Sequence, residues 1–160
     1  MTKMKFCIIP LILLTLFLSS CATIRYGANA SPEMLEYSEI ITIDSKSHNE
    51  LYIRANEWFV DNFASAESVI QFQDKEDGKL LGKYVITVTD QLVTYAIKST
   101  VAIDVKEGKV RIEFRDPYWR QVDTNDYELL VKKRGAEIMN PKWREFAASF
   151  KNYMQEDNEW

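Results

Sequence analysis

The feature that most limits the fold of this chain is a long segment, residues 93–105, in which apolar and polar side chains alternate. Its apolar residues hold alternate positions and polar residues hold most of the others: Val93, Tyr95, Ile97, Val101, Ile103 and Val105, against Thr94, Lys98, Thr100 and Asp104. Successive side chains of a β-strand point to opposite faces of a sheet. The pattern therefore predicts a half-buried strand, with one side on a core and the other in solvent.

Similar alternation predicts strands near residues 69–73, 84–89 and 110–115, and an earlier one at 38–43. The segment from Lys106 to Lys109 is expected to form a hairpin loop. We expect Asp116-Pro117 to end the last strand, because a proline has no N–H to give to the hydrogen-bond ladder.

Two amphipathic helices are predicted beside these strands. The first begins at Ser47, which forms a capping box with Glu50, and its apolar residues recur every three or four positions: Leu51, Ala55, Trp58, Phe59 and Phe63. The second is expected to begin at Asn140-Pro141 and has a similar stripe: Trp143, Phe146, Ala147, Phe150 and Tyr153. The order strand, helix, four strands, helix predicts an α+β domain, an antiparallel sheet with both helices packed on one face.

An acidic cluster and a Gly-Lys pair lie between the predicted strands near residues 69–73 and 84–89. This segment is compatible with either a ligand-binding loop or a hairpin turn. Gly78 to Tyr84 imitates a phosphate-binding loop, but it has three spacer residues instead of four, and Tyr84 replaces the metal-binding hydroxyl residue. Asp74, Glu76 and Asp77 lack the twelve-residue spacing of a calcium loop. We therefore predict a solvated hairpin turn.

The stretch from Tyr118 to Met139 is expected to be a loop or to contain one short strand. Four of its residues suit an aromatic platform for a partner, since aromatic and arginine side chains dominate binding hot spots, but such residues also seal the ends of sheets: Tyr118, Trp119, Arg120 and Tyr127. The basic residues Lys132, Lys133 and Arg134 suit either a solvated loop or contact with anionic lipid headgroups.

The N-terminus has the layout of a secretory signal, residues 1–20. Lys3 and Lys5 precede an apolar run of about 13 residues, which is shorter than the roughly 20 residues that span a bilayer. Leu18-Ser19-Ser20-Cys21 resembles a bacterial lipobox, in which the cysteine carries a thioether-linked diacylglycerol and a further acyl chain such as palmitate. Lipidation of Cys21 is expected; the alternative is an ordinary signal cleaved near Ala28 to Ala30, with Cys21 discarded. Residues 21–37 are then a lipidated tether, and residues 38–160 one domain.

By similarity to bacterial lipoproteins, Ala22 after the cysteine implies the outer membrane, with the domain facing the periplasm. Removal of residues 1–20 discards Cys7, leaves 140 of the 160 residues, and changes the formal charge from -4 to -6. With Cys21 alkylated, no disulfide can form within the chain, so stability must come from a packed core. An acidic domain is poorly suited to nucleic acid, whose binding relies on neutralising phosphates.

A family resemblance is carried by residues 51–59, LYIRANEWF, and by residues 68–83, in particular SVIQFQDKEDG followed by Leu81-Gly82-Lys83. They resemble a domain family common in Bacteroidetes lipoproteins, a domain of unknown function with a fold like the TATA-binding protein. The resemblance covers residues 40–114 and implies the element order that periodicity predicts. The family supplies no catalytic residues, and DNA binding does not follow from the fold alone.

The preferred functional hypothesis is a non-enzymatic, membrane-anchored envelope lipoprotein that binds another protein, with no cofactor or metal. His48 is the only histidine, so a triad or a multi-histidine zinc site within one chain is excluded. One alternative is a carrier of a small apolar ligand or glycan. Another is a hydrolase that uses the carboxylates of Asp74, Glu76 and Asp126. A homodimer through exposed sheet edges is also compatible with the pattern.

Overall fold

A computed structural model describes the chain over residues 27–62 and 69–156. The elements, in chain order, are η1 (Pro32–Met34), β1 (Tyr37–Thr42), α2 (His48–Asn62), β2 (Val69–Asp74), β3 (Lys79–Asp90), β4 (Val93–Lys106), β5 (Lys109–Gln121), β6 (Glu128–Leu129) and α3 (Lys133–Gln155). The predicted signal and Cys21 lie outside the described residues. Within them, no helix combines the length and the apolar character needed to cross a bilayer.

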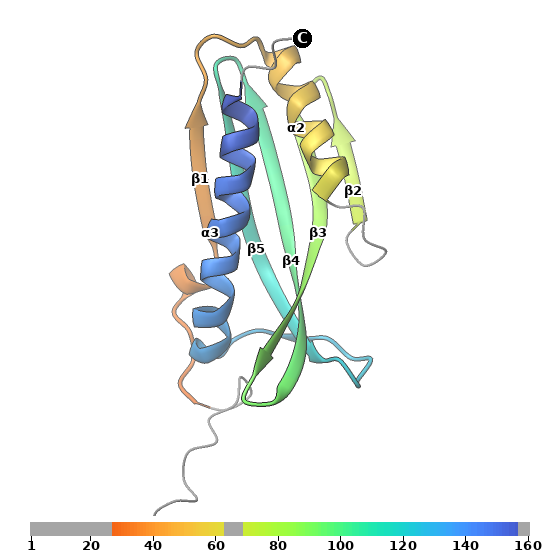
Figure 1. Ribbon diagram of the computed structural model, residues 1–160, viewed down its shortest axis with the longest axis vertical. Coiled ribbons are helices and arrows are strands. Elements are labelled where there is room, and N and C mark those ends of the chain that lie inside the picture. The colour runs from red at the N-terminus through yellow and green to blue at the C-terminus, as the bar shows by residue number, and fades with distance from the viewer. Residues whose placement is uncertain (1–26, 63–68, 157–160) are drawn as a thin grey trace, which may run out of the picture.

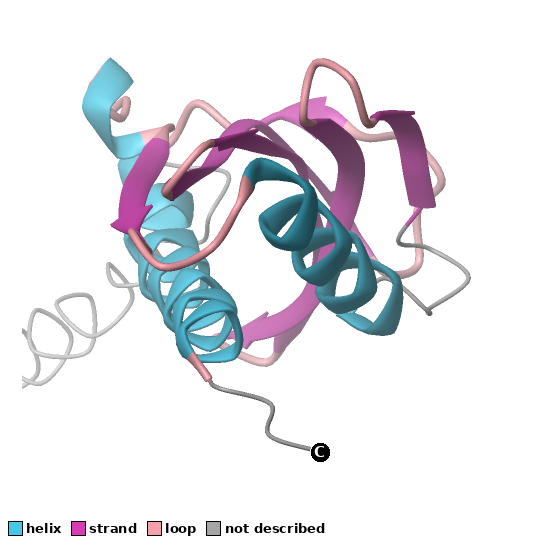
Figure 2. Cartoon of the chain, turned by 90° about the horizontal axis from the view of Figure 1, so that it is seen from above, coloured by secondary structure: helices cyan, strands magenta, loops and turns pink. Residues whose placement is uncertain are grey.

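The strands form one antiparallel sheet in the order β1-β5-β4-β3-β2, and β6 pairs with the last part of β5. Both helices lie on the same side of this sheet, as the two views in Figures 1 and 2 show. The expected α+β architecture is therefore confirmed. The long alternating segment is the single strand β4, and β6 is a short strand within the stretch from Tyr118 to Met139.

The start of α2 follows from its capping box. The Ser47 Oγ accepts a hydrogen bond from the Glu50 backbone N–H at 3.3 Å, and the Glu50 carboxylate accepts one from the Ser47 backbone N–H at 3.0 Å. The first N–H groups of a helix have no partner within the helix, so these bonds stabilise its first turn. Glu107, in the β4–β5 turn, accepts a third from the His48 N–H at 2.8 Å.

The core lies between the sheet and the two helices. Trp143 of α3 is fully buried, stacks on Phe114 of β5 with ring centroids 5.8 Å apart, and donates its indole N–H to the Ser99 hydroxyl of β4 at 3.2 Å. Trp58 of α2 packs at 4.8 Å against Phe150 of α3. These contacts fix the position of both helices on the same face.

The prediction that Asp116-Pro117 ends its strand was wrong. β5 continues to Gln121, and its pairing with β4 shifts between Lys98 and Thr100, so that two residues of β5 lie opposite the single residue Ser99. This is a β-bulge, with Asp116 at φ 51°. A bulge is one of the few places within a sheet that accept a residue without an N–H.

The predicted start of the second helix at Asn140-Pro141 was also wrong, because α3 begins at Lys133 and Pro141 lies inside it. The earlier turns carry the buried residues Ala136 and Met139, which continue the stripe of Trp143 towards the N-terminus. The Asn140 side chain donates to the Ala136 carbonyl at 3.3 Å and to the Met34 carbonyl at 2.7 Å, which ties η1 to the helix.

The first described residues lie against the start of α3. The Ala30 N–H donates to the Val131 carbonyl at 2.8 Å, and the Lys133 N–H donates to the Ala28 carbonyl at 2.9 Å. This end of the predicted tether is thus held beside the beginning of the last helix.

Candidate functional site

Because both helices lie on one side, the opposite side of the sheet is covered by no described element. We call this side the open face. Residues that are directly opposite each other in an antiparallel pair point to the same face. The pairing of Ile40 with Arg111, Arg111 with Asp104, and Asp104 with Lys79 therefore places these four side chains in one row across the open face.

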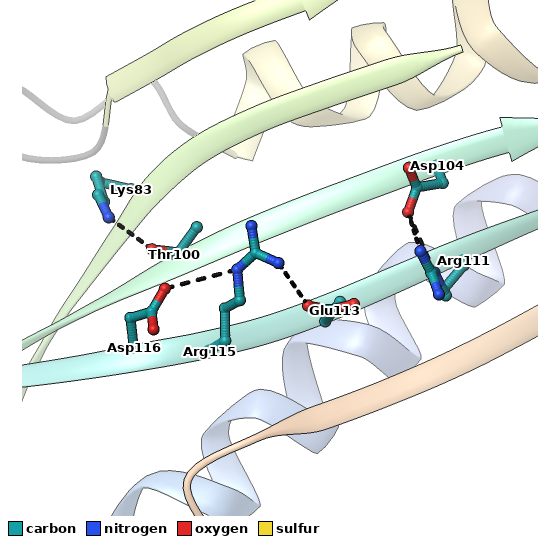
Figure 3. A network of polar contacts seen from close by, with 7 residues as sticks. All are labelled: Lys83, Thr100, Asp104, Arg111, Glu113, Arg115 and Asp116. Carbon is teal, nitrogen blue, oxygen red and sulfur yellow. Dashed lines mark hydrogen bonds and ion pairs between the residues drawn. The ribbon is translucent and has the colours of Figure 1, made fainter. Parts of the chain in front are cut away.

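The half of the open face nearest the β4–β5 turn is dominated by paired charges (Figure 3). Arg111 of β5 donates to Asp104 of β4 from Nη2 at 2.6 Å and from Nε at 3.1 Å, and this pairing raises the pKa of the Arg111 guanidinium. Arg115 contacts Glu113 at 2.9 Å and Asp116 at 3.5 Å. We call this set the charge ladder. Its charges largely neutralise one another, so it offers little net attraction to a charged ligand.

Beside the charge ladder lies a hollow of about 480 Å³. Its lining combines apolar and charged side chains: Ile40, Asp77, Lys79, Asp104, Val105, Lys106, Lys109, Val110 and Arg111. Asp104 is engaged by Arg111, and Asp77 by Lys79 at 3.2 Å. Lys106 and Lys109, which are directly opposite each other across the hairpin, give this hollow an excess of positive charge.

The other half of the open face carries an aromatic and cationic cluster. The Lys98 Nζ lies 4.0 Å from the centre of the Tyr127 ring, and the Arg120 guanidinium lies 5.2 Å from the same centre. Tyr118 is opposite Lys98 on one side and Leu129 on the other. We call these five residues the tyrosine cluster. Its side chains point to one face, and Tyr118 remains 37% exposed.

Of the four residues predicted as an aromatic platform, the structure brings three together. Tyr118, Arg120 and Tyr127 belong to the tyrosine cluster, whereas Trp119 is only 7% exposed and packs edge to face on Tyr95 at 5.4 Å. Arg120 also holds the β5–β6 loop, since its Nη1 donates to the Thr124 carbonyl at 2.8 Å and the Val122 carbonyl at 3.1 Å. The Lys98 and Arg120 cations both lie over the Tyr127 ring, and these cation–π contacts hold Tyr127 in the cluster.

Sequence reasoning missed Lys98 and Leu129. Lys98 lies on β4 and Tyr127 in the loop before β6, so only the strand pairing brings them together. The available signal was the position of Lys98 on the polar side of the longest strand. Leu129 was hidden because β6 has only two residues.

The acidic segment between β2 and β3 is a hairpin turn, as predicted. The Asp77 N–H donates to the Asp74 carboxylate at 3.0 Å, and Gly78 adopts φ 66°. A Cβ at Gly78 would lie 2.5 Å from the Val105 carbonyl oxygen and 2.6 Å from the His48 Nε2. This glycine is therefore required by close packing of the turn on β4 and on the start of α2.

The carboxylates considered for hydrolysis do not form one site. Asp74 and Glu76 lie at the β2–β3 turn, beside the end of β4, whereas Asp126 lies in the β5–β6 loop near the start of β4. At about 3.3 Å per residue, the two ends of β4 are separated by about 40 Å. In the described part of the chain, no group of three or more His, Cys, Asp or Glu residues is arranged to hold a metal ion.

Hollows on the helix side are lined by both polar and apolar residues. One of about 560 Å³ between α2 and α3 is lined by Trp58, Asp61, Asn62, Glu145, Ala148, Ser149, Asn152, Tyr153 and Glu156. Another of about 390 Å³ contains Tyr84, whose pKa is raised by burial and, to a smaller extent, by Glu145. A tyrosine with a raised pKa stays protonated at neutral pH and is a poor general base.

Comparison with known proteins agrees with this architecture. A family model described as "Domain of unknown function (DUF4468) with TBP-like fold" matches residues 37–119. No curated protein matches the sequence. Among solved structures, the chain is similar to a TBP-like protein from Parabacteroides distasonis ATCC 8503, with 14% identity and a TM-score of 0.65 over 77% of this chain and 94% of that chain.

It is also similar to a DUF4468 family protein from Bacteroides ovatus ATCC 8483, with 15% identity and a TM-score of 0.53 over 84% of this chain and 94% of that chain. At these identities the two structures show the fold alone. The resemblance to a Bacteroidetes family of unknown function with a TBP-like fold is confirmed, while the lipoprotein assignment stays a prediction.

Proposed function

We propose a binding role for this chain, which belongs to the DUF4468 family of domains of unknown function with a TBP-like fold. In this proposal the protein is anchored to the outer membrane by lipid on Cys21, faces the periplasm, and engages another envelope protein through the open face of its sheet. It carries out no reaction of its own. The comparisons indicate a domain of unknown function and no catalytic family.

The observation that carries the proposal is the tyrosine cluster on the open face. Tyrosine and arginine side chains contribute much of the binding energy at protein interfaces when they are held rigidly and then buried by a partner. Here Tyr127 is held by Lys98 at 4.0 Å and by Arg120 at 5.2 Å, and Tyr118 and Leu129 lie beside it on the same face. The neighbouring charge ladder supplies a polar surround.

The test is site-specific photo-crosslinking in cells. A photoreactive amino acid replaces Tyr118 on the open face or, as a control, Ile53 on α2, which is 43% exposed on the helix side. We expect one dominant partner from position 118, identified by mass spectrometry after membrane purification, and not from position 53. A crosslink to a second copy of this chain would identify a homodimer instead.

A substitution then links the partner to the cluster. Tyr127→Ala is expected to weaken capture from position 118 by about tenfold, since loss of a well-buried aromatic anchor costs about 1–2 kcal/mol or more. The control, Thr42→Ala at the other end of the open face, should leave capture unchanged. The binding proposal fails if position 118 captures nothing, or if positions 118 and 53 capture the same set of proteins.

A further inference from the structure

The β3–β4 hairpin ends in an exposed leucine that has no role in the fold of the described residues. The two turn residues, Gln91 and Leu92, have φ 48° and 71°, and the Leu92 side chain is 100% exposed. Two-residue hairpin turns that require positive φ at both positions favour Asn and Gly. A leucine gains neither an easy backbone conformation nor burial at this position. The fully exposed Leu92 side chain is well placed to contact something outside the domain.

Several other features lie at the same end of the molecule. Val122, which is 50% exposed, follows β5 and donates its N–H to the Thr94 carbonyl at 3.1 Å, beside the hairpin. Arg134 at the start of α3 binds Asp90 at the base of the hairpin, with a Nη2–Oδ1 distance of 2.7 Å. Since Lys133 binds Ala28, the hairpin, the start of α3 and the first described residues form one end of the domain, the lower end in Figure 1. We call it the entry end.

We propose that the entry end lies on the surface of a phospholipid bilayer, with the Leu92 side chain inserted among the headgroups and Val122 beside it. This proposal rests on the lipid anchor at Cys21. Five residues separate Cys21 from Gly27, and an extended chain covers at most about 3.6 Å per residue, so the anchor lies within about 20 Å of the entry end. A domain held this close to the bilayer must present some surface to it.

The charges at the entry end indicate that apolar insertion, and not attraction to anionic lipid, dominates its contact with the bilayer. Lys132 donates to Asn29 at 2.9 Å, Lys133 pairs with Glu137 at 3.8 Å, and Arg134 is engaged by Asp90. The exposed Asp123 beside Val122 adds a negative charge. Because Lys133 and Arg134 are paired with carboxylates and Asp123 opposes the charge of Lys132, anionic lipid gains little attraction, and the apolar tip carries the contact. Insertion is therefore expected in zwitterionic phosphatidylcholine vesicles as well as in vesicles that contain phosphatidylglycerol.

A bilayer fits this end better than a protein partner does. Leu92 stands at the tip of a hairpin and lines none of the hollows described above, so it projects from the domain as a single exposed apolar side chain. Shallow insertion of an apolar tip needs no complementary groove, because the acyl and headgroup boundary adapts to it.

The test measures depth with one fluorescent label on the full-length, lipidated protein in phosphatidylcholine vesicles. Acylation blocks the thiol of Cys21 and export removes Cys7, so an added cysteine is the reactive one. A polarity-sensitive dye is placed by Val122→Cys at the entry end, or by Ser45→Cys in the β1–α2 loop at the opposite end. Nitroxide lipids should quench the dye at position 122 by about twofold or more and leave the dye at position 45 unquenched.

The role of Leu92 is tested in the same labelled protein. Leu92→Asn suits the positive φ, so the hairpin is preserved while the apolar tip is lost. We expect this change to reduce quenching at position 122 to near the level at position 45, whereas Ile53→Asn, at an exposed apolar position of α2, should not. Unchanged quenching in the Leu92→Asn protein, or a water-like dye at position 122 in vesicle-bound protein, would overturn the proposal.

Fractionation separates this inference from the anchor on which it rests. If the wild-type protein and the Cys21→Ser form are both found in the soluble fraction, the lipid anchor is wrong, and the membrane contact fails with it. If only the Cys21→Ser form is soluble but position 122 is not quenched in the wild type, the anchor stands and the membrane contact alone is wrong.

Discussion

On the helix side of the sheet, Trp143 and Phe114 are fully buried and stacked on one another, whereas on the open face of the same strands Arg111 and Asp104 pair in partial contact with solvent. The first face is held by close packing and excludes water. The second satisfies its own charges and leaves its aromatic groups accessible. The comparison teaches that one sheet here has two separable roles, stability on one face and contact with other molecules on the other.

The largest effect should come from the buried face. Trp143→Ala removes a fully buried indole between α3 and the sheet, and it is expected to lower the free energy of unfolding by about 3–5 kcal/mol. Urea unfolding followed by circular dichroism measures this loss. The matched change on the open face, Tyr118→Ala, should cost about 1 kcal/mol or less. Equal losses at the two positions would break the proposed separation of roles.

A polar contact within the buried face should have the next largest effect. Ser99→Ala leaves the buried Trp143 indole N–H without its acceptor, now 3.2 Å away, and should cost about 1–3 kcal/mol. The check is a double-mutant cycle with Trp143→Phe, which has no donor. If Ser99→Ala lowers the free energy of unfolding equally in the Trp143→Phe background, the loss does not come from the hydrogen bond between the two side chains.

Paired charges on the open face should contribute less. Arg111→Ala and Asp104→Ala each remove one side of the 2.6 Å contact, and the coupling energy between them is expected to be about 0–1 kcal/mol. It should decrease in high salt, because salt screens exposed charges. A coupling energy as large as that of Ser99 with Trp143 would show that the charge ladder is a stabilising feature and not only a solvated surface.

The smallest effect is expected at the boundary between the faces, and it depends on pH. A hydrogen bond from Lys151 is the main reason why the pKa of Glu39 is lowered from 4.5, with Tyr37 contributing less. The folded state thus favours the carboxylate. The ionised Glu39 carboxylate therefore stabilises the folded state above pH 4.5. This contribution is lost as the pH falls through the lower pKa that Glu39 has in the folded state.

Glu39→Gln should therefore flatten the decline of stability on the acid side of pH 4.5 and leave the neutral region with only a small loss. Melting temperatures measured from pH 3 to pH 7 test this, with Glu36→Gln as the control from the adjoining segment. A Glu39→Gln profile that is parallel to the wild-type profile throughout would contradict it.

The sequence was informative wherever structure depends on near neighbours. Alternation predicts β4, and the spacing of Ser47 and Glu50 predicts the start of α2, because each rests on residues a few positions apart. The start of α3 is not predicted correctly, because a proline after an asparagine is typical of the first turn of a helix, and Pro141 lies inside this one. In the folded protein the turns before it are held by burial of Ala136 and Met139 and by the contact of Asn140 with Met34.

The candidate surface was predictable only in part, and the bulge explains why. Counting alternate positions along β5 from Val110 would place position 118 on the buried face and position 119 on the open face. The extra residue at Asp116-Pro117 reverses this order, so Trp119 is buried and Tyr118 is exposed. Nothing local to residues 118–127 indicates that reversal, and the contact of Lys98 with Tyr127 depends on it.

Pro117 has a further consequence for how the strands find their partners. β4 and β5 both alternate over many residues, so a pairing shifted by one position would exchange the faces of one strand. A proline can be accommodated only where the ladder is already interrupted, and opposite Ser99 it is. A pairing that moved Pro117 out of the bulge would leave a ladder position without its N–H. The proline therefore disfavours shifted alignments of β4 and β5 relative to the observed one.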